Sequence, residues 1–345
     1  MTETELYESA AKWFSGFELD TDALFQALSA GEMSEAFRLL TAAVLDSFGS
    51  PFAFFKSVLV SFLLLGIGGA VLKILDETLK EGQAGLIGEF IVRLLLAGQL
   101  VVLFEEALSM SRELLNTIVT FGSFFVPVFS VVLTSVSGTG TSAGYIALLS
   151  LVVYITERLL LQILLPLLEV HFLLVTLAGF WQKERLERVL KLMEKAFRFV
   201  CKGLLGAVTG LGFLQSLVLP YADALKIGTL KRATQMVPGV GTITGSTWDL
   251  LTGSAVLLKN TVGVLGVAAL LLAAAYPLCR LLLLQVSLRL SAAFMSLLGA
   301  GDLGWSVEES GTSVEYLINV CGLSVLLFLV WVILAVCTTN LRLML

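Results

Sequence analysis

The sequence predicts an all-α fold: a polytopic membrane helix bundle of about seven to nine spans, some of them broken by proline and glycine. Of the 345 residues, 57% are hydrophobic and only 14% are charged. The mean hydropathy of +0.94 is far above what a soluble domain of this size needs to fill its core. Apolar runs of about 20 residues also recur along the chain, and each is long enough to cross a bilayer.

The charge balance and the available chemistry exclude several classes of protein. A net charge of −5 gives no electrostatic reason to expect a nucleic-acid partner. One histidine and four cysteines without CxxC spacing leave little for a metal site. The sequence also lacks the motifs of nucleotide binding and zinc proteolysis. We therefore expect no enzymatic activity, no cofactor and no metal.

Residues 1–50 are predicted to form acidic amphipathic helices outside the bilayer. They carry nine acidic side chains against Lys12 and Arg38, with apolar residues at roughly helical spacing. The extreme N-terminus holds Glu3, Glu5 and Glu8 where a signal peptide would have a basic region, so no cleavable signal is expected. The remaining residues, 51–345, are predicted to form the transmembrane domain.

The first three spans are predicted at about 57–75, 86–104 and 117–136. A polar connector over 105–113 separates the second span from the third, and Pro127 interrupts the third. In the second span Glu89 and Arg93 stand four residues apart, which favours an intramembrane ion pair on one helical face.

The later apolar runs do not all have the length of a single span. The apolar run over 145–180 exceeds one membrane thickness, so we divide it near Pro166. Further spans are predicted at about 261–286 and 316–338, separated by a polar acidic segment over 287–315.

Residues 181–202 predict a basic amphipathic helix. They carry seven Lys or Arg residues and set apolar side chains on one face. A positive cluster of this kind favours a cytoplasmic location against anionic lipid, and docking on a partner helix is the alternative. Counting outward from it predicts an external N-terminus, an external loop over 299–315 and a cytoplasmic C-terminus.

The segment over 228–266 is apolar, yet glycines and one proline interrupt it too often for an unbroken helix. At membrane depth a broken helix is tolerated only against protein or beside a watery cavity, and such breaks often form transport sites. A loop outside the bilayer is the alternative interpretation. The residues of this candidate conduit or docking segment are Pro238, Gly239, Gly241, Gly245, Asp249, Lys259 and Asn260.

An internal repeat is a further hypothesis. Pro127 and Pro238 lie 111 residues apart, and so do Pro166 and Pro277. This spacing is consistent with two copies of one unit over 86–180 and 197–300, or with coincidence among six prolines.

A resemblance to a known family rests on the same glycine-rich segment. Residues 237–241 read VPGVG, and residues 257–266 read LLKNTVGVLG after a polar linker. In these motifs the sequence resembles the stage III sporulation protein AE family, and the similarity extends from about residue 30 to the C-terminus. Two features depart from the family: the signal peptide common among members is absent here, and Thr242 to Ser246 (TITGS) replaces the usual second glycine pair.

The resemblance implies a multi-pass protein of the mother-cell membrane that surrounds the forespore. It implies a non-enzymatic subunit of a channel or secretion complex that includes other membrane proteins of a sporulation operon, a secretion-type ATPase and a forespore membrane partner. A stand-alone secondary transporter of a small solute and a membrane scaffold stay as alternatives. A homo-oligomer stays open, and membrane lipids are expected neighbours.

Overall fold

The computed structural model describes residues 49–79, 82–137, 140–180, 186–207, 210 and 241–340, with a few separate positions between 23 and 42. Every described residue is helical apart from the short turns at 179–180 and 298–300. The helices are α4 (Gly49–Leu79), α5 (Gly82–Ser137), α6 (Gly140–Leu159), the π-helix η1 (Leu160–Leu164), α7 (Leu165–Ala178), α9 (Gly241–Leu297) and α10 (Gly301–Asn340). An unlabelled helix over residues 186–207, here called the basic helix, follows α7.

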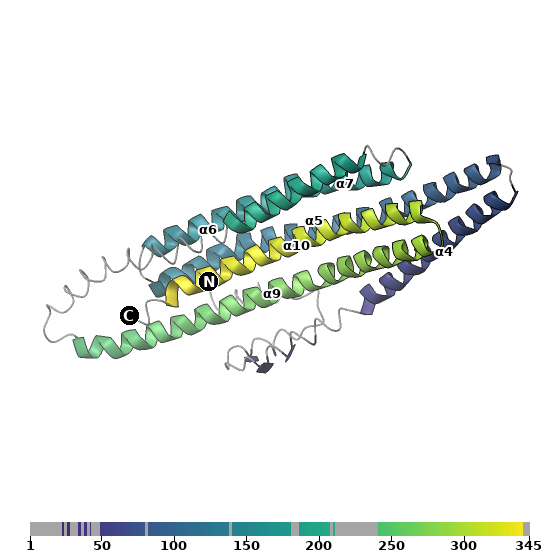
Figure 1. Ribbon diagram of the computed structural model, residues 1–345. Coiled ribbons are helices and arrows are strands. Elements are labelled where there is room, and N and C mark those ends of the chain that lie inside the picture. Colours follow the sequence, from purple (N-terminus) through teal and green to yellow (C-terminus); the bar gives the residue numbers. More distant parts are fainter. Residues whose placement is uncertain are drawn as a thin grey trace.

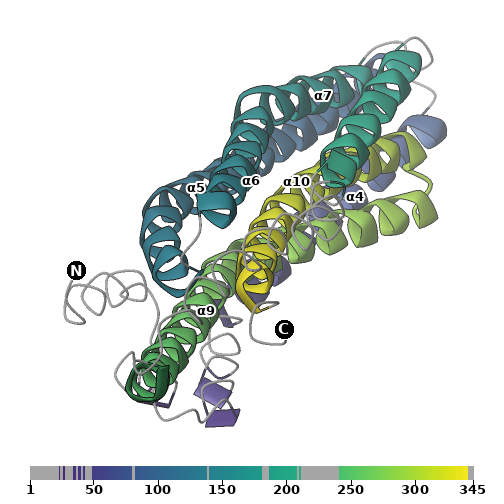
Figure 2. The same cartoon turned by 90° about the vertical axis from the view of Figure 1, so that its left-hand side faces the viewer.

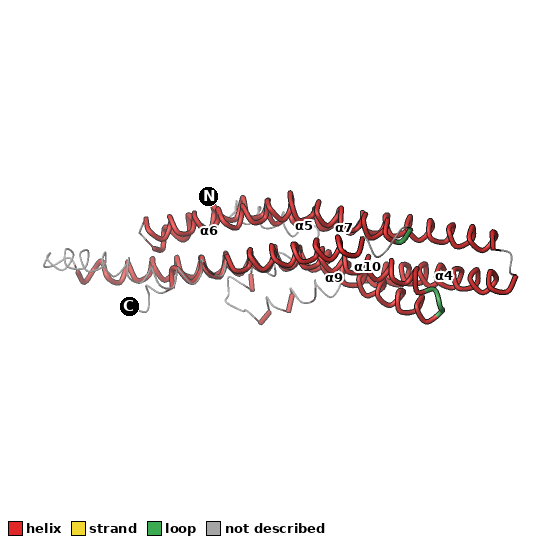
Figure 3. The backbone as a smooth tube through the Cα atoms, turned by 45° about the horizontal axis from the view of Figure 1, so that its top comes forward, coloured by secondary structure: helices red, strands yellow, loops and turns green. Residues whose placement is uncertain are grey.

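The helices lie side by side along one long axis and form an elongated bundle (Figures 1 and 2). The colours of Figure 1 show that α4 and α5 run in opposite directions, as do α9 and α10. Helices α6, η1 and α7 form one continuous rod (Figure 3). Helix α10 lies at the centre of the bundle, in contact with α9, α5, α7 and α6. In its most apolar window 61% of the residues are buried, against 22% for α4, so α4 is the more peripheral helix.

The core is apolar and rich in aromatic rings. The rings of Phe104 on α5 and Phe172 on α7 stack at 3.9 Å between centroids. The rings of Phe121, Phe328 and Trp331 form a second group in which neighbouring centroids lie 5.3 and 5.6 Å apart. These rings fix the contacts of α10 with the helices around it.

Five helices are long and apolar enough to cross a membrane, judged by length and composition. The seven to nine spans expected from the sequence are not confirmed among the described residues. The repeat over 86–180 and 197–300 stays a prediction, because most of 208–240 lies outside the described residues. The candidate spans are Pro51–Ile74, Ile87–Ser123, Ser150–Ala178, Gly266–Leu297 and Gly301–Ile333.

The predicted connector over 105–113 is wrong, because α5 continues through it without a break. Its apolar residues Ala107 and Leu108 are buried, as are Leu114 and Leu115 one to two turns further on. The charged residues between them lie on the exposed face, so the segment is an amphipathic helix. Its high average polarity is what made it resemble a connector between two spans.

The predicted division near Pro166 is also wrong. Pro166 lies in the first turn of α7, directly after η1, and the helical rod passes through it. The preceding turn widens into η1, in which the Leu165 N–H bonds the Leu160 carbonyl five residues back. The apolar run therefore continues as one rod instead of two spans.

The polar segment over 287–315 is not a loop. Helix α9 continues to Leu297, and α10 begins at Gly301. Between them Gly299 has φ +82°, a left-handed conformation that favours glycine. Hydrogen bonds from the Ala300 and Gly299 N–H groups to the Met295 and Ser296 carbonyls close the end of α9 in a Schellman motif.

Small side chains let α9 and α10 approach closely along this hairpin. Ser287, Ser291 and Ser310 are fully buried, and each hydroxyl donates to a carbonyl four residues earlier in its own helix. Packing of small residues is the usual way in which membrane helices come together.

Candidate functional site

The segment that the sequence indicated as a conduit or docking site lies only partly within the described residues. Pro238 and Gly239 lie outside them. From Gly241 onward the backbone is helical as the first part of α9, so the expected broken helix is wrong for 241–266. Gly245, Asp249, Lys259 and Asn260 lie on this helix, but their side chains are outside the described residues.

Glu89 and Arg93 form the ion pair expected from their spacing, with 2.6 Å between Glu89 Oε1 and Arg93 Nη2. Arg93 also donates to the Gly179 carbonyl at 2.7 Å and lies 3.9 Å from the Asp302 carboxylate. These contacts join α5 to the ends of α7 and α10.

The same contacts contradict the predicted topology. It placed 181–196 in the cytoplasm and 299–315 outside, yet Arg93 touches both Gly179 and Asp302. The turn after α7 and the turn between α9 and α10 therefore lie at one end of the bundle. They share one side of any membrane that the bundle crosses, and the far end of α10 lies on the other.

This topology gives a labelling prediction. Cysteines at Arg188 and at Leu297, which is 84% exposed, are expected to react with a membrane-impermeant thiol reagent from the same side. A cysteine at Asn340, the other end of α10, is expected to react only from the opposite side. Labelling of Arg188→Cys and Leu297→Cys from opposite sides of oriented vesicles would contradict the arrangement.

Three further ion pairs link different helices in the middle of the bundle. Arg112 on α5 lies 2.9 Å from Glu169 on α7. Arg280 on α9 pairs with Glu106 on α5, and its guanidinium lies 4.3 Å from the centre of the Phe54 ring. Arg289 on α9 pairs with Glu315 on α10. Charges in an apolar setting are normally neutralised in this way.

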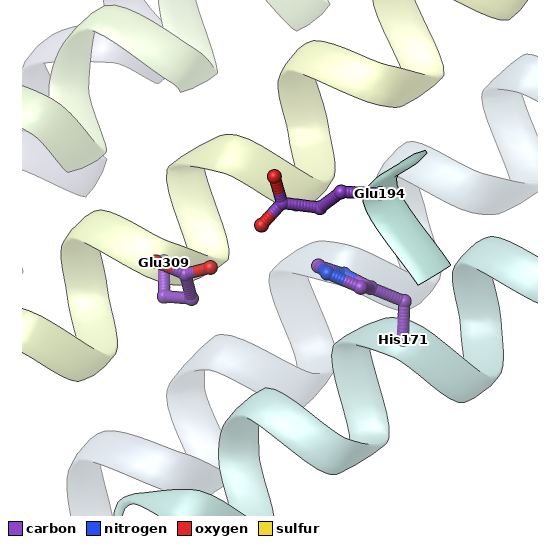
Figure 4. A group of neighbouring side chains, drawn as sticks. All are labelled: His171, Glu194 and Glu309. Carbon is purple, nitrogen blue, oxygen red and sulfur yellow. The ribbon is translucent and has the colours of Figure 1, made fainter. Parts of the chain in front are cut away.

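His171 is buried on α7 and faces two carboxylates from other helices (Figure 4). Glu194 comes from the basic helix and Glu309 from α10. One ligand atom from each residue lies within 4.8 Å of the others, so the three side chains could hold a metal ion. Here they are called the His–Glu–Glu cluster.

The basic helix packs on the bundle through this cluster. Leu190 and Phe197 are buried, and the Phe197 ring lies 4.6 Å from the Tyr316 ring on α10. Its exposed face carries local ion pairs: Glu187 accepts a hydrogen bond from Lys191 at 2.5 Å and so raises the pKa of that lysine. The apolar residues Leu190 and Phe197 therefore pack on another helix of the same chain, as in the alternative to a lipid-facing helix.

Glu157 on α6 is a buried carboxylate, with only 2% of the residue exposed. Its Oε2 accepts a hydrogen bond from Ser324 of α10 at 2.6 Å, and its Oε1 has no partner among the described groups. Sequence reasoning missed this residue, although a carboxylate inside an apolar run is itself a signal of function.

The exposed face of α5 carries a row of polar side chains inside a candidate span. The row follows helical spacing and borders a shallow groove of about 480 Å³. It is here called the polar stripe and comprises Glu105, Ser109, Arg112, Glu113, Asn116, Thr120 and Ser123. The sequence prediction placed residues 105–113 in a connector and Thr120 and Ser123 in a span, so the row was not recognised as one feature.

The long apolar helices and the ion pairs between them define a polytopic membrane protein of the helix-bundle class. The chain belongs to the family described as Stage III sporulation protein AE, which matches residues 19–339. It is 25% identical over 289 residues to stage III sporulation protein AE of Bacillus subtilis (strain 168), an alignment that covers 83% of this chain and 72% of that protein. No solved structure matches the chain. The family resemblance expected from the VPGVG and LLKNTVGVLG motifs is confirmed.

Proposed function

We propose that this chain is a non-enzymatic membrane subunit of a sporulation-specific channel or secretion complex that links mother cell and forespore. It acts in the mother-cell membrane around the forespore, with other membrane proteins of the same operon, a secretion-type ATPase and a forespore membrane partner. Family membership across residues 19–339 carries the sporulation role. The polar stripe of α5 supports the role as a subunit.

The polar stripe cannot face hydrocarbon without cost. Polar and charged side chains at membrane depth normally face a protein interior or a water-filled cavity. Glu113, Asn116 and Thr120 are instead exposed on the outer surface of the bundle. At membrane depth such a stripe lines a watery path or covers the surface of another subunit, which supports the role of the chain in a complex.

Cysteine accessibility tests which role the stripe has. The four native cysteines are first replaced by alanine; burial raises the pKa of the Cys201 thiol to about 11, so this one is already poorly reactive. In sporulating cells, Ser109→Cys, Asn116→Cys and Thr120→Cys are expected to react with a small membrane-impermeant thiol reagent. Their rates should exceed that of Val102→Cys at least tenfold, because Val102 is 65% exposed but lies in the apolar part of the same face of α5, one turn before the stripe begins.

The outcome separates conduit from scaffold. Reaction of all three stripe cysteines in the assembled complex supports a water-filled path. Protection in the complex, with reaction in the purified subunit, supports a scaffold whose stripe is covered by a partner. Rates equal to that of Val102→Cys in both preparations would contradict the proposal.

A stand-alone transporter is the second candidate function. The buried Glu157, with one carboxylate oxygen lacking a partner among the described groups, favours it because such groups often relay protons in transporters. Solute accumulation by the purified protein alone in liposomes, lost in Glu157→Gln, would favour this candidate over the complex subunit.

A further inference from the structure

We propose that His171, Glu194 and Glu309 form a binding site for a divalent transition-metal ion, with Zn²⁺ as the best fit. The site joins α7, the basic helix and α10 at one point inside the bundle (Figure 4). This role is independent of the proposed membrane complex and was not expected from the sequence, which offered one histidine and no metal-binding motif.

The environment of His171 favours a bound metal ion. The residue is 1% exposed, and its Nε2 has no hydrogen-bond partner among the described groups. A buried nitrogen without a partner costs about 1–3 kcal/mol. Figure 4 shows the ring pointing toward the two carboxylates, so a cation between them would satisfy this nitrogen.

The orientation of the His171 imidazole also suits a metal ligand. Its Nδ1 lies 3.0 Å from the Ser313 hydroxyl. That hydroxyl in turn donates to the Glu309 carbonyl at 3.4 Å, so it is available to accept from Nδ1–H. With the proton on Nδ1, Nε2 carries the lone pair. Metal-binding histidines are commonly held in this way through the second ring nitrogen.

The distances between the ligand atoms of the three residues are suitable for one metal ion. Ligand atoms within 4.8 Å of one another leave a centre no more than about 2.8 Å from each. Bonds to zinc measure about 2.0–2.2 Å from nitrogen or carboxylate oxygen, so small side-chain rotations would complete the site. Leu168, Met193 and Phe197 lie beside His171 and Glu194 and line this part of the bundle with apolar side chains.

The excess of negative charge around the cluster favours a bound cation. Glu187, Glu194 and Glu308 all lie near enough to Glu309 for their negative charges to repel it. Lys191 pairs with Glu187, and Arg198 pairs with Glu194 at 2.6 Å. The four carboxylates carry four negative charges, the two cations carry two positive charges, and the imidazole is neutral. A divalent ion would balance the two negative charges that remain.

The donor set indicates the class of metal. One imidazole and two carboxylates suit Zn²⁺, Fe²⁺ or Mn²⁺, whereas thiolates would be needed for copper(I) and oxygen ligands alone for calcium. A tight site with few ligands favours four-coordinate Zn²⁺ over ions that prefer six ligands. The hydroxyl of Tyr316 hydrogen-bonds with Glu194 and can hold that carboxylate in place.

Zinc binding to the purified full-length chain, with any affinity tag removed, tests the site. The protein is stripped with a chelator in detergent and titrated with ZnCl₂, and bound zinc is measured by mass spectrometry of the metal together with the melting temperature. We expect about one zinc per chain and a rise in melting temperature. Glu309→Gln should weaken zinc binding at least tenfold.

Glu308→Gln is the matched control, because it removes the neighbouring carboxylate on the same helix but no ligand. It should weaken zinc binding far less than Glu309→Gln does, because Glu308 contributes a nearby charge but no ligand atom. Glu309 is only partly buried, so its variant keeps the core intact, and His171→Gln gives a second ligand deletion where the protein folds. Absence of zinc binding, or equal binding in Glu309→Gln and Glu308→Gln, would overturn the site.

Discussion

Trp331→Ala is expected to lower the free energy of unfolding by about 3 kcal/mol, the lower end of the range for a buried tryptophan. The side chain is fully buried, its ring packs against Phe328, and its Nε1 donates to the Ser150 hydroxyl at 3.0 Å. Truncation leaves a cavity between α10 and α6. The lower end applies because an unfolded helix in a membrane still keeps its apolar side chains out of water.

Unfolding of the detergent-solubilised protein, followed by circular dichroism, measures this loss. Phe199→Ala is the control, since this aromatic side chain is 79% exposed on the basic helix. It should change stability by less than about 0.5 kcal/mol. Similar losses in both variants would contradict the position of Trp331 in the core.

Gly304→Ala is expected to destabilise the α9–α10 hairpin by about 1–3 kcal/mol. A Cβ atom at this position would lie 2.9 Å from the backbone oxygen of Ala292 and 2.8 Å from Ser296 Oγ. The Ser296 side chain can rotate away, but the backbone of α9 cannot move without separating the two helices.

Gly322→Ala on the same helix is the matched control. A Cβ there meets nothing within 4 Å, so the change should be neutral or slightly stabilising through helix propensity. The same unfolding measurement compares the two variants. A Gly304→Ala protein as stable as Gly322→Ala would show that the two helices do not approach as closely as described.

The membrane-bundle class could be predicted from the sequence because composition alone determines it. The first span, predicted at 57–75, lies within α4. The errors arose where an amphipathic helix resembles a loop in average polarity. Residues 105–113 carry charges on one face and buried Ala107 and Leu108 on the other, and a hydropathy average removes that distinction.

Contacts within one helix were accessible to sequence reasoning, and contacts between helices were not. Glu89 and Arg93 pair because four residues make one turn. By contrast, Glu169 pairs with Arg112, 57 residues away, and His171 bonds Ser313, 142 residues away. The rotation of each helix within the bundle selects such partners, and no local pattern in a single sequence encodes that rotation.

The length of α5 exceeds the thickness of a membrane. Its 56 residues extend over about 84 Å, whereas the hydrocarbon core of a bilayer is about 30 Å thick. Even at the steepest usual tilt, roughly half of this helix must project beyond the lipid. The helix therefore has one part of its length within the membrane and another part outside it.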